Sequence, residues 1–111
     1  MTVIVKNIIP RKQAEDTQTT QYTAVNCKCI IDKFSVTNTS GSNVTFSVNL
    51  VQSLGTAGDS NLVLAEKSIF PNETYLCPEL INQVLENGGF ISTIASTASA
   101  LTISASGREV S

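Results

Sequence analysis

The chain has 111 residues, of which 41% are hydrophobic and 14% charged, with a net charge of −2 and no histidine. We expect one domain with a thin core, because a chain of this length buries only about two-thirds of its unfolded surface. The low, slightly acidic charge argues against a nucleic-acid binder. Without histidine, the commonest general base and a frequent metal ligand are missing. We therefore expect no enzyme, no cofactor and no metal site.

The N-terminal segment divides into an apolar and a polar part. Residues 2–9 are β-branched and apolar, which predicts a short edge strand that ends at Pro10. Residues 10–23 are polar and show no period, which predicts a loop or clasp. We expect residues 1–23 to form an extended arm and residues 24–111 to form the folded domain. The segment lacks the basic and long apolar regions of a signal peptide.

The middle of the chain carries the clearest strand pattern. Residues 26–38 alternate, but the apolar phase slips by one position, which predicts a β-bulge near Asp32-Lys33. Residues 44–52 alternate without interruption, and with the turn between them the two segments predict an antiparallel hairpin. Its buried face supplies the predicted core. That core comprises Phe34, Val36, Phe46, Val48 and Leu50.

The remaining elements complete a small sandwich. Residues 53–61 predict a flexible loop, 62–70 a strand, and 90–97 and 101–110 two further strands. Residues 78–86 predict the one short helix, with Pro78 at its first position. About six strands with turns at regular spacing indicate an all-β fold: a small antiparallel β-sandwich, jelly-roll-like or immunoglobulin-like.

The three cysteines allow two interpretations. Cys27 and Cys29 would lie roughly 6.5 Å apart along one strand face, which is too far for an unstrained disulfide. Cys77 would lie at a helix start, where a thiolate is favoured, so a reactive pair that includes it is one possibility. We favour the other, in which all three are small buried hydrophobic side chains with free thiols.

Two further patterns have simple structural interpretations. Asp59-Ser60-Asn61 offers oxygen ligands but lacks the acidic spacing of a calcium loop, so we read it as a connector. Three Asn-X-Ser/Thr triplets, beginning at Asn38, Asn43 and Asn72, are read as turn chemistry rather than glycosylation sites.

Charged residues gather near the two ends of a chain that has few of them. Two interpretations are open: a solvated charge cluster, or mobile polar ends that clasp a partner subunit. The aromatic residues are mostly expected on core faces, which leaves Tyr22 and Tyr75 for surface contacts. The candidate partner contacts are Lys6, Arg11, Lys12, Tyr22, Arg108 and Glu109.

From about Thr17 onward, the chain resembles a family of small virion proteins of tailed bacteriophages. The resemblance is the sum of short pieces in the same order and contains no catalytic signature. The pieces are Thr19-Thr20-Gln21-Tyr22-Thr23-Ala24, Ile31-Asp32-Lys33-Phe34, Val36-Thr37-Asn38-Thr39-Ser40, Ser60-Asn61-Leu62-Val63, Pro71-Asn72-Glu73-Thr74-Tyr75, Pro78-Glu79-Leu80, Val84-Leu85 and Ser106-Gly107-Arg108-Glu109-Val110.

The resemblance implies a non-enzymatic structural component of a phage particle, made in the host cytoplasm and located in the virion. Among such components we expect a capsid decoration or cement protein that binds the major capsid protein and other copies of itself as a homo-oligomer. Alternatives are a neck, collar or tail accessory protein, and a displayed module that binds a host surface or glycan. Neither nucleic acid nor membrane is an expected partner.

Overall fold

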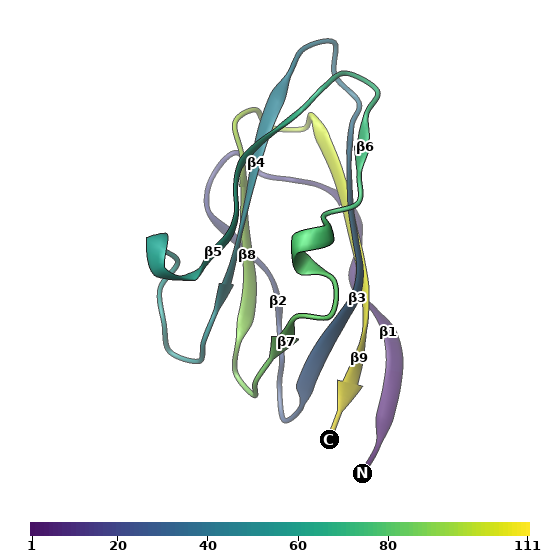
Figure 1. Cartoon of the computed structure of the whole chain (residues 1–111), viewed down its shortest axis with the longest axis vertical. Helices are drawn as coiled ribbons and strands as arrows, with labels where there is room; N and C mark the ends of the chain where they lie inside the picture. The colour runs from purple at the N-terminus through teal and green to yellow at the C-terminus, as the bar shows by residue number, and fades with distance from the viewer.

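The computed structural model describes residues 1–111 as two antiparallel β-sheets packed face to face (Figure 1). One sheet has the order β1-β9-β3-β6, with β7 also paired to β3, and the other has the order β2-β8-β4-β5. The strands are β1 (Val3–Gln13), β2 (Thr19–Thr23), β3 (Lys28–Asn38), β4 (Val44–Val51), β5 (Leu62–Ile69), β6 (Thr74–Tyr75), β7 (Val84–Leu85), β8 (Phe90–Ala95) and β9 (Leu101–Val110). The helical elements are two 3₁₀ turns, η1 (Asp59–Asn61) and η2 (Pro78–Leu80). Neither turn is long or apolar enough to cross a lipid bilayer.

Successive strands mostly alternate between the two sheets. Only β4 and β5 follow each other within one sheet as neighbours, while β6 and β7 together fill one edge position beside β3. This order of paired strands is that of an eight-stranded jelly roll. The predicted all-β antiparallel sandwich is thus confirmed, and its topology is the jelly-roll alternative.

The core lies between the two sheets and is built from the inward side of each strand. Phe34 and Phe46 are both fully buried, with ring centroids 6.2 Å apart. Val36 and Val48 are also buried, whereas Leu50 is only partly buried and packs against the rim of the core. Four of the five predicted core residues are therefore fully buried, and Leu50 marks where the core ends.

The predicted hairpin between residues 26–38 and 44–52 is wrong. β3 and β4 belong to different sheets, and β4 pairs with β5 and β8 instead. Two consecutive strands with one apolar face each can share a sheet or face each other across the core, and alternation alone does not distinguish the two. The turn at residues 39–43 spans the sandwich, so the two apolar faces meet.

The predicted β-bulge is present. The register of β3 against β9 shifts between Ile31 and Lys33. Gly107 lies opposite this point, and a Cβ there would be 2.5 Å from the Ile30 carbonyl oxygen. The close backbone approach at the bulge therefore requires glycine at position 107.

The predicted helix over residues 78–86 is wrong beyond its first turn. After η2, Asn82 adopts a left-handed conformation at φ 68°, and the chain becomes extended. Asn82 N–H donates to the Ile31 carbonyl, and Ile31 N–H donates to the Gln83 carbonyl. The open edge of β3 thus competes with the helix for backbone hydrogen bonds, and a two-turn helix is too weak to resist.

The N-terminal segment forms more strand than expected. Residues 3–9 pair with β9 as the edge strand of their sheet, as predicted. The strand continues through Pro10 to Gln13, and residues 19–23 form β2, so the expected loop over 10–23 shrinks to residues 14–18. Pro10 is tolerated because an edge strand needs hydrogen bonds on one side only. Ile8, Ile9 and Ala14 are buried in the core.

Candidate interaction surface

Three of the predicted contact residues meet at the end of the sandwich where the two termini lie (Figure 1). Glu109 is on the inward face of β9, and the Tyr22 hydroxyl of β2 donates a hydrogen bond to its carboxylate. Lys6 Nζ lies 3.5 Å from the same carboxylate. We call Lys6, Tyr22 and Glu109 the terminal cluster. It ties β1 and β9 of one sheet to β2 of the other.

The terminal cluster shifts the ionisation of its own members. Burial, and next the contact with Glu109, raise the pKa of Tyr22, so the hydroxyl stays protonated. The hydrogen bond from Tyr22, aided by the charge of Lys6, lowers the pKa of Glu109. The donor and the acceptor of this bond therefore keep their roles across the neutral range.

We expect Tyr22→Phe to lower the melting temperature near neutral pH, with a difference from the wild type that shrinks at both pH extremes. The lowered pKa of Glu109 gives stability that is present above about pH 4.3 and is lost as the pH falls. The raised pKa of Tyr22 gives stability that is lost as the pH rises above about 10. Melting curves of both proteins across pH test this. A difference that is constant with pH would contradict the bond.

Arg108 lies on the outward face of β9 and is engaged within the chain. Its guanidinium forms a forked contact with Asp32 of β3, with nitrogen–oxygen distances of 2.8 to 3.1 Å. The β-bulge displaces Asp32, so that its carboxylate reaches Arg108 on the outward face of the sheet. The contact with Asp32 raises the pKa of Arg108. Both side chains stay partly exposed. The pair therefore remains accessible to a neighbour.

Arg11 and Lys12 lie further along β1, away from the terminal cluster. Lys12 forms an exposed ion pair with Glu15 at 2.8 Å, and this contact, followed by the bond from Gln21, lowers the pKa of Glu15. Arg11 is exposed and has no ion-pair partner within the chain. Of the six predicted contact residues, the structure thus gathers Lys6, Tyr22, Glu109 and Arg108 at one end and leaves Arg11 the freest cation.

The first half of β1 is an exposed apolar edge. Val3 and Ile4 are each 50% exposed, and Val5 is 76% exposed. The strand pairs with β9 on one side only, and its other side is open. Such an edge presents free backbone donors and acceptors beside apolar side chains, which is a template for strand pairing.

The cysteines are free and buried, as predicted. Cys77 adopts a left-handed conformation before η2, and burial raises its pKa to about 12, which disfavours the alternative of a reactive thiolate there. Burial also raises the pKa of Cys29. The single 3₁₀ turn that replaces the predicted helix does not offset the cost of burying a charge.

We expect iodoacetamide at pH 7.5 to label the native protein slowly and the denatured, unreduced protein at all three cysteines. The physical reason is that buried, protonated thiols are poor nucleophiles. Mass spectrometry of the two samples gives the count. A disulfide-linked peptide in the unreduced digest would overturn this expectation.

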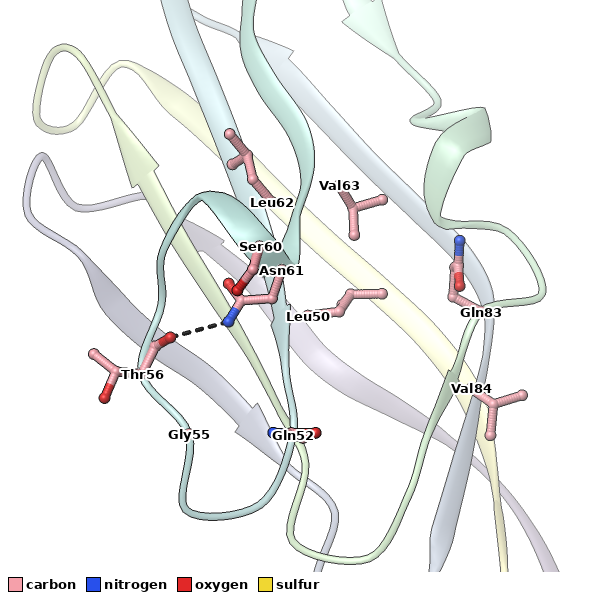
Figure 2. Close-up of a pocket in the computed structure, with 10 residues that line it drawn as sticks. All are labelled: Leu50, Gln52, Gly55, Thr56, Ser60, Asn61, Leu62, Val63, Gln83 and Val84. Carbon is pink, nitrogen blue, oxygen red and sulfur yellow. Dashed lines mark hydrogen bonds between the residues drawn. The ribbon is translucent and has the colours of Figure 1, made fainter.

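The opposite flank of the sandwich carries a groove of about 650 Å³ that the sequence did not reveal. It lies between β4–β5 and the segment from η2 to β7, and Figure 2 shows Leu50 and Val63 pointing into this space. Gln83 and Val84 form its other wall. The groove exists because β7 is extended, so the predicted helix concealed it.

The loop of residues 53–61 is held by amide side chains. Asn61 Nδ2 donates to the Thr56 carbonyl at 2.9 Å (Figure 2), and Asn49 Nδ2 donates to Asn61 Oδ1 at 2.7 Å. Asn61 Oδ1 also accepts from Gly58 N–H at 3.0 Å. Asn61, one of the residues considered as a calcium ligand, is therefore committed to shaping the loop.

Comparisons with known proteins give the fold. The sequence matches no protein-family model and no curated protein sequence. A chain in a structure of the infectious bursal disease virus Gx strain aligns with 98% of this chain at a TM-score of 0.61 and 15% identity. A chain in the crystal structure of the infectious bursal disease virus VP2 subviral particle covers 97% at 14% identity, with a TM-score of only 0.47.

The likeness concerns part of a larger protein. This chain spans about a third of the length of each matched chain, 33% and 31%. At 15% identity, the first match establishes a shared fold and no shared activity. These matches do not test the resemblance to tailed-phage proteins, which stays a prediction.

Proposed function

We propose that this protein is a non-enzymatic structural component of a bacteriophage virion, a capsid decoration or cement protein that binds neighbouring coat subunits. The observation that carries the proposal is the β1 flank: an open edge strand with exposed apolar residues at one end and the free cation Arg11 at the other. The shared fold with a chain from a virus structure, at 15% identity, supports the coarser part of the proposal, a virion protein.

The contact with the coat is assigned to the second half of β1 and the loop that follows it. Arg11 and Lys12 lie there with exposed side chains. Lys12 can exchange its ion pair with Glu15 for one with a partner protein, because exposed ion pairs contribute only about 0–1 kcal/mol. We propose that these cations meet acidic groups of the major capsid protein. Residues 1–23 then act as the binding segment of the sandwich, to which they also contribute β1 and β2.

The experiment is a binding titration on coat particles that lack this protein. The wild type should saturate at a fixed ratio to the coat subunit, and Arg11→Glu should bind more weakly because the reversed charge repels an acidic partner. Lys33→Glu is the matched control, since it makes the same charge change at an exposed position of β3. Equal binding by all three proteins would contradict the assigned contact. A density map with the protein at the neck or tail would replace decoration by an accessory role there.

A second candidate function is a displayed module that binds a host surface or glycan. The observation in its favour is the groove of Figure 2, whose wall includes the amide side chains of Gln52 and Gln83. Amides suit sugar hydroxyls, yet none of the residues that line the groove is aromatic. Binding to host envelope fragments that Gln83→Ala abolishes, without loss of particle binding, would favour this second function.

A further inference from the structure

The four edge positions of the two sheets differ in how well they resist pairing with another chain. β2 is polar and irregular at Thr20–Tyr22, while β5 is kinked at Glu66, which has φ 46°. β6 and β7 have two residues each. Bulges, polar residues and short length are the usual protection of sheet edges. These three edge positions are therefore poor templates.

β1 is protected over only its second half. Beyond Lys6 it contains two register shifts, Pro10 and the cations Arg11 and Lys12. From Val3 to Lys6 its pairing with β9 is regular, and Val3, Ile4 and Val5 are at least half exposed. The first half of β1 is thus the one regular and apolar edge among the four.

The direction of the backbone groups in this segment follows from one residue pair. Thr2 and Ser111 exchange both backbone hydrogen bonds, at 2.8 and 2.9 Å. Hydrogen-bonded and non-hydrogen-bonded pairs alternate along an antiparallel ladder. Ile4 and Lys6 therefore bond to β9, whereas the N–H and C=O groups of Val3 and Val5 face the open edge.

We propose that the occupant of this edge is the same segment of a second copy, paired antiparallel about a two-fold axis through Ile4. Two copies pair most readily through edges that lack bulges and kinks, and among the four edge positions only the first half of β1 is regular and apolar. In this register Val3 exchanges both hydrogen bonds with Val5 of the second copy, and Val5 does so with Val3. The sheets that contain β1 in the two copies then join into one continuous sheet.

The side chains and charges of this arrangement are compatible. On the outward face, Val3 and Val5 of both copies form one apolar stripe, continued by Val110, which pairs with Val3. On the inward face, Ile4 lies against its counterpart. Each copy brings Lys6 with Glu109 to the seam, so the seam has no net charge and the two lysines can face the glutamates of the other copy. Arg11 and Lys12 lie beyond the paired segment.

The inference deepens the proposed function. It rests on that function only for the idea that many copies bound to one particle bring these edges close together. An isologous contact between identical edges closes after two copies. The coat contact uses the second half of β1, and the self-contact uses the first half. One strand can therefore serve both partners.

Association is tested on the purified full chain by sedimentation velocity over a concentration series. We expect the wild type to shift from monomer to dimer as concentration rises, and Val5→Lys to raise the dimer dissociation constant by about tenfold or more. Val25→Lys is the matched control, since Val25 is 69% exposed outside the strands. It should dimerise like the wild type. Equal association of Val5→Lys and wild type, or a wild type that stays monomeric, would overturn the inference.

Disulfide trapping tests the register. Ile4→Cys should form a covalent dimer under mild oxidation, because residues on the axis lie about 4.5 Å apart at Cα. Val3→Cys and Val5→Cys should each cross-link poorly alone and efficiently when mixed, while Leu54→Cys on an exposed loop gives the collision background. Background-level trapping of Ile4→Cys, or no gain on mixing, would contradict the register.

The proposed coat contact and the proposed self-pairing can be refuted independently of each other. Arg11→Glu reports on the coat contact, and Val5→Lys reports on self-pairing. A Val5→Lys protein that stays monomeric yet still saturates particles would support self-pairing in solution and leave the coat contact intact. Cross-linking of Ile4→Cys on particles to a chain other than a second copy would overturn the self-pairing and assign the edge to that chain.

Discussion

Phe46→Ala is expected to lower the free energy of unfolding by about 3–5 kcal/mol. Phe46 is fully buried in β4, and its ring faces Phe34 across the core at 6.2 Å between centroids. Removing the ring leaves a cavity between the two sheets at a point where both supply aromatic side chains. The loss is a large part of the roughly 5–15 kcal/mol that stabilises a typical domain. Urea unfolding followed by circular dichroism measures it.

Phe70→Ala is the matched control for this prediction. Phe70 follows β5 and is 56% exposed, so the same change in side chain should alter stability by only about 0.5 kcal/mol. If both variants unfolded at the wild-type midpoint, the inward face of β4 would have been assigned to the wrong residues. If both lost stability equally, the effect would not arise from the core.

Much of the fold could be predicted because period-two alternation reports burial directly. The pattern at residues 44–52 placed Phe46 and Val48 inside, and the phase slip in residues 26–38 located the bulge beside Lys33. The same pattern does not say which sheet a strand joins. β3 and β4 were therefore correctly recognised as strands and incorrectly paired, since their pairing depends on the course of the turn at residues 39–43.

The helix and the groove show where local signals lose to tertiary structure. Pro78 and the apolar spacing after it favour a helix, and one 3₁₀ turn does form. The rest is overridden because Ile31 offers both backbone groups to Asn82 and Gln83. These partners lie some fifty positions earlier in the chain and leave no local signal. The groove beside β7 was missed for the same reason.

The candidate contacts were predicted from the scarcity of charge rather than from a motif. That argument selected Lys6, Arg108 and Glu109, and the β1–β9 pairing brings these residues to one end. It did not foresee their partners within the chain, because Asp32 and Tyr22 reach them from other strands. It also overlooked Val3 and Val5. Their exposure depends on β1 being an edge strand and on the lack of any strand beyond it.

Asn38→Ala is expected to lower the free energy of unfolding by about 2 kcal/mol, because the buried Ile69 carbonyl left without its donor costs about 1–3 kcal/mol, whereas Ser42 is exposed. Asn38 is the last residue of β3 and is fully buried. Its side-chain amide donates to the carbonyls of Ser42 and Ile69, both at 2.8 Å. Its side-chain oxygen accepts from the backbone N–H and the hydroxyl of Ser40.

These bonds explain why the chain turns from one sheet to the other at this point. Ile69 ends β5 in the second sheet, and Ser42 lies in the turn that leads to β4, so the amide of Asn38 joins the end of β3 to both. Asn43→Ala is the matched control, since Asn43 is exposed in the same turn. Urea unfolding of both variants should show a large loss for Asn38→Ala and almost none for Asn43→Ala. An equal, small loss in both variants would mean that the passage of the chain from one sheet to the other is held by the packing of Phe34 against Phe46 rather than by Asn38.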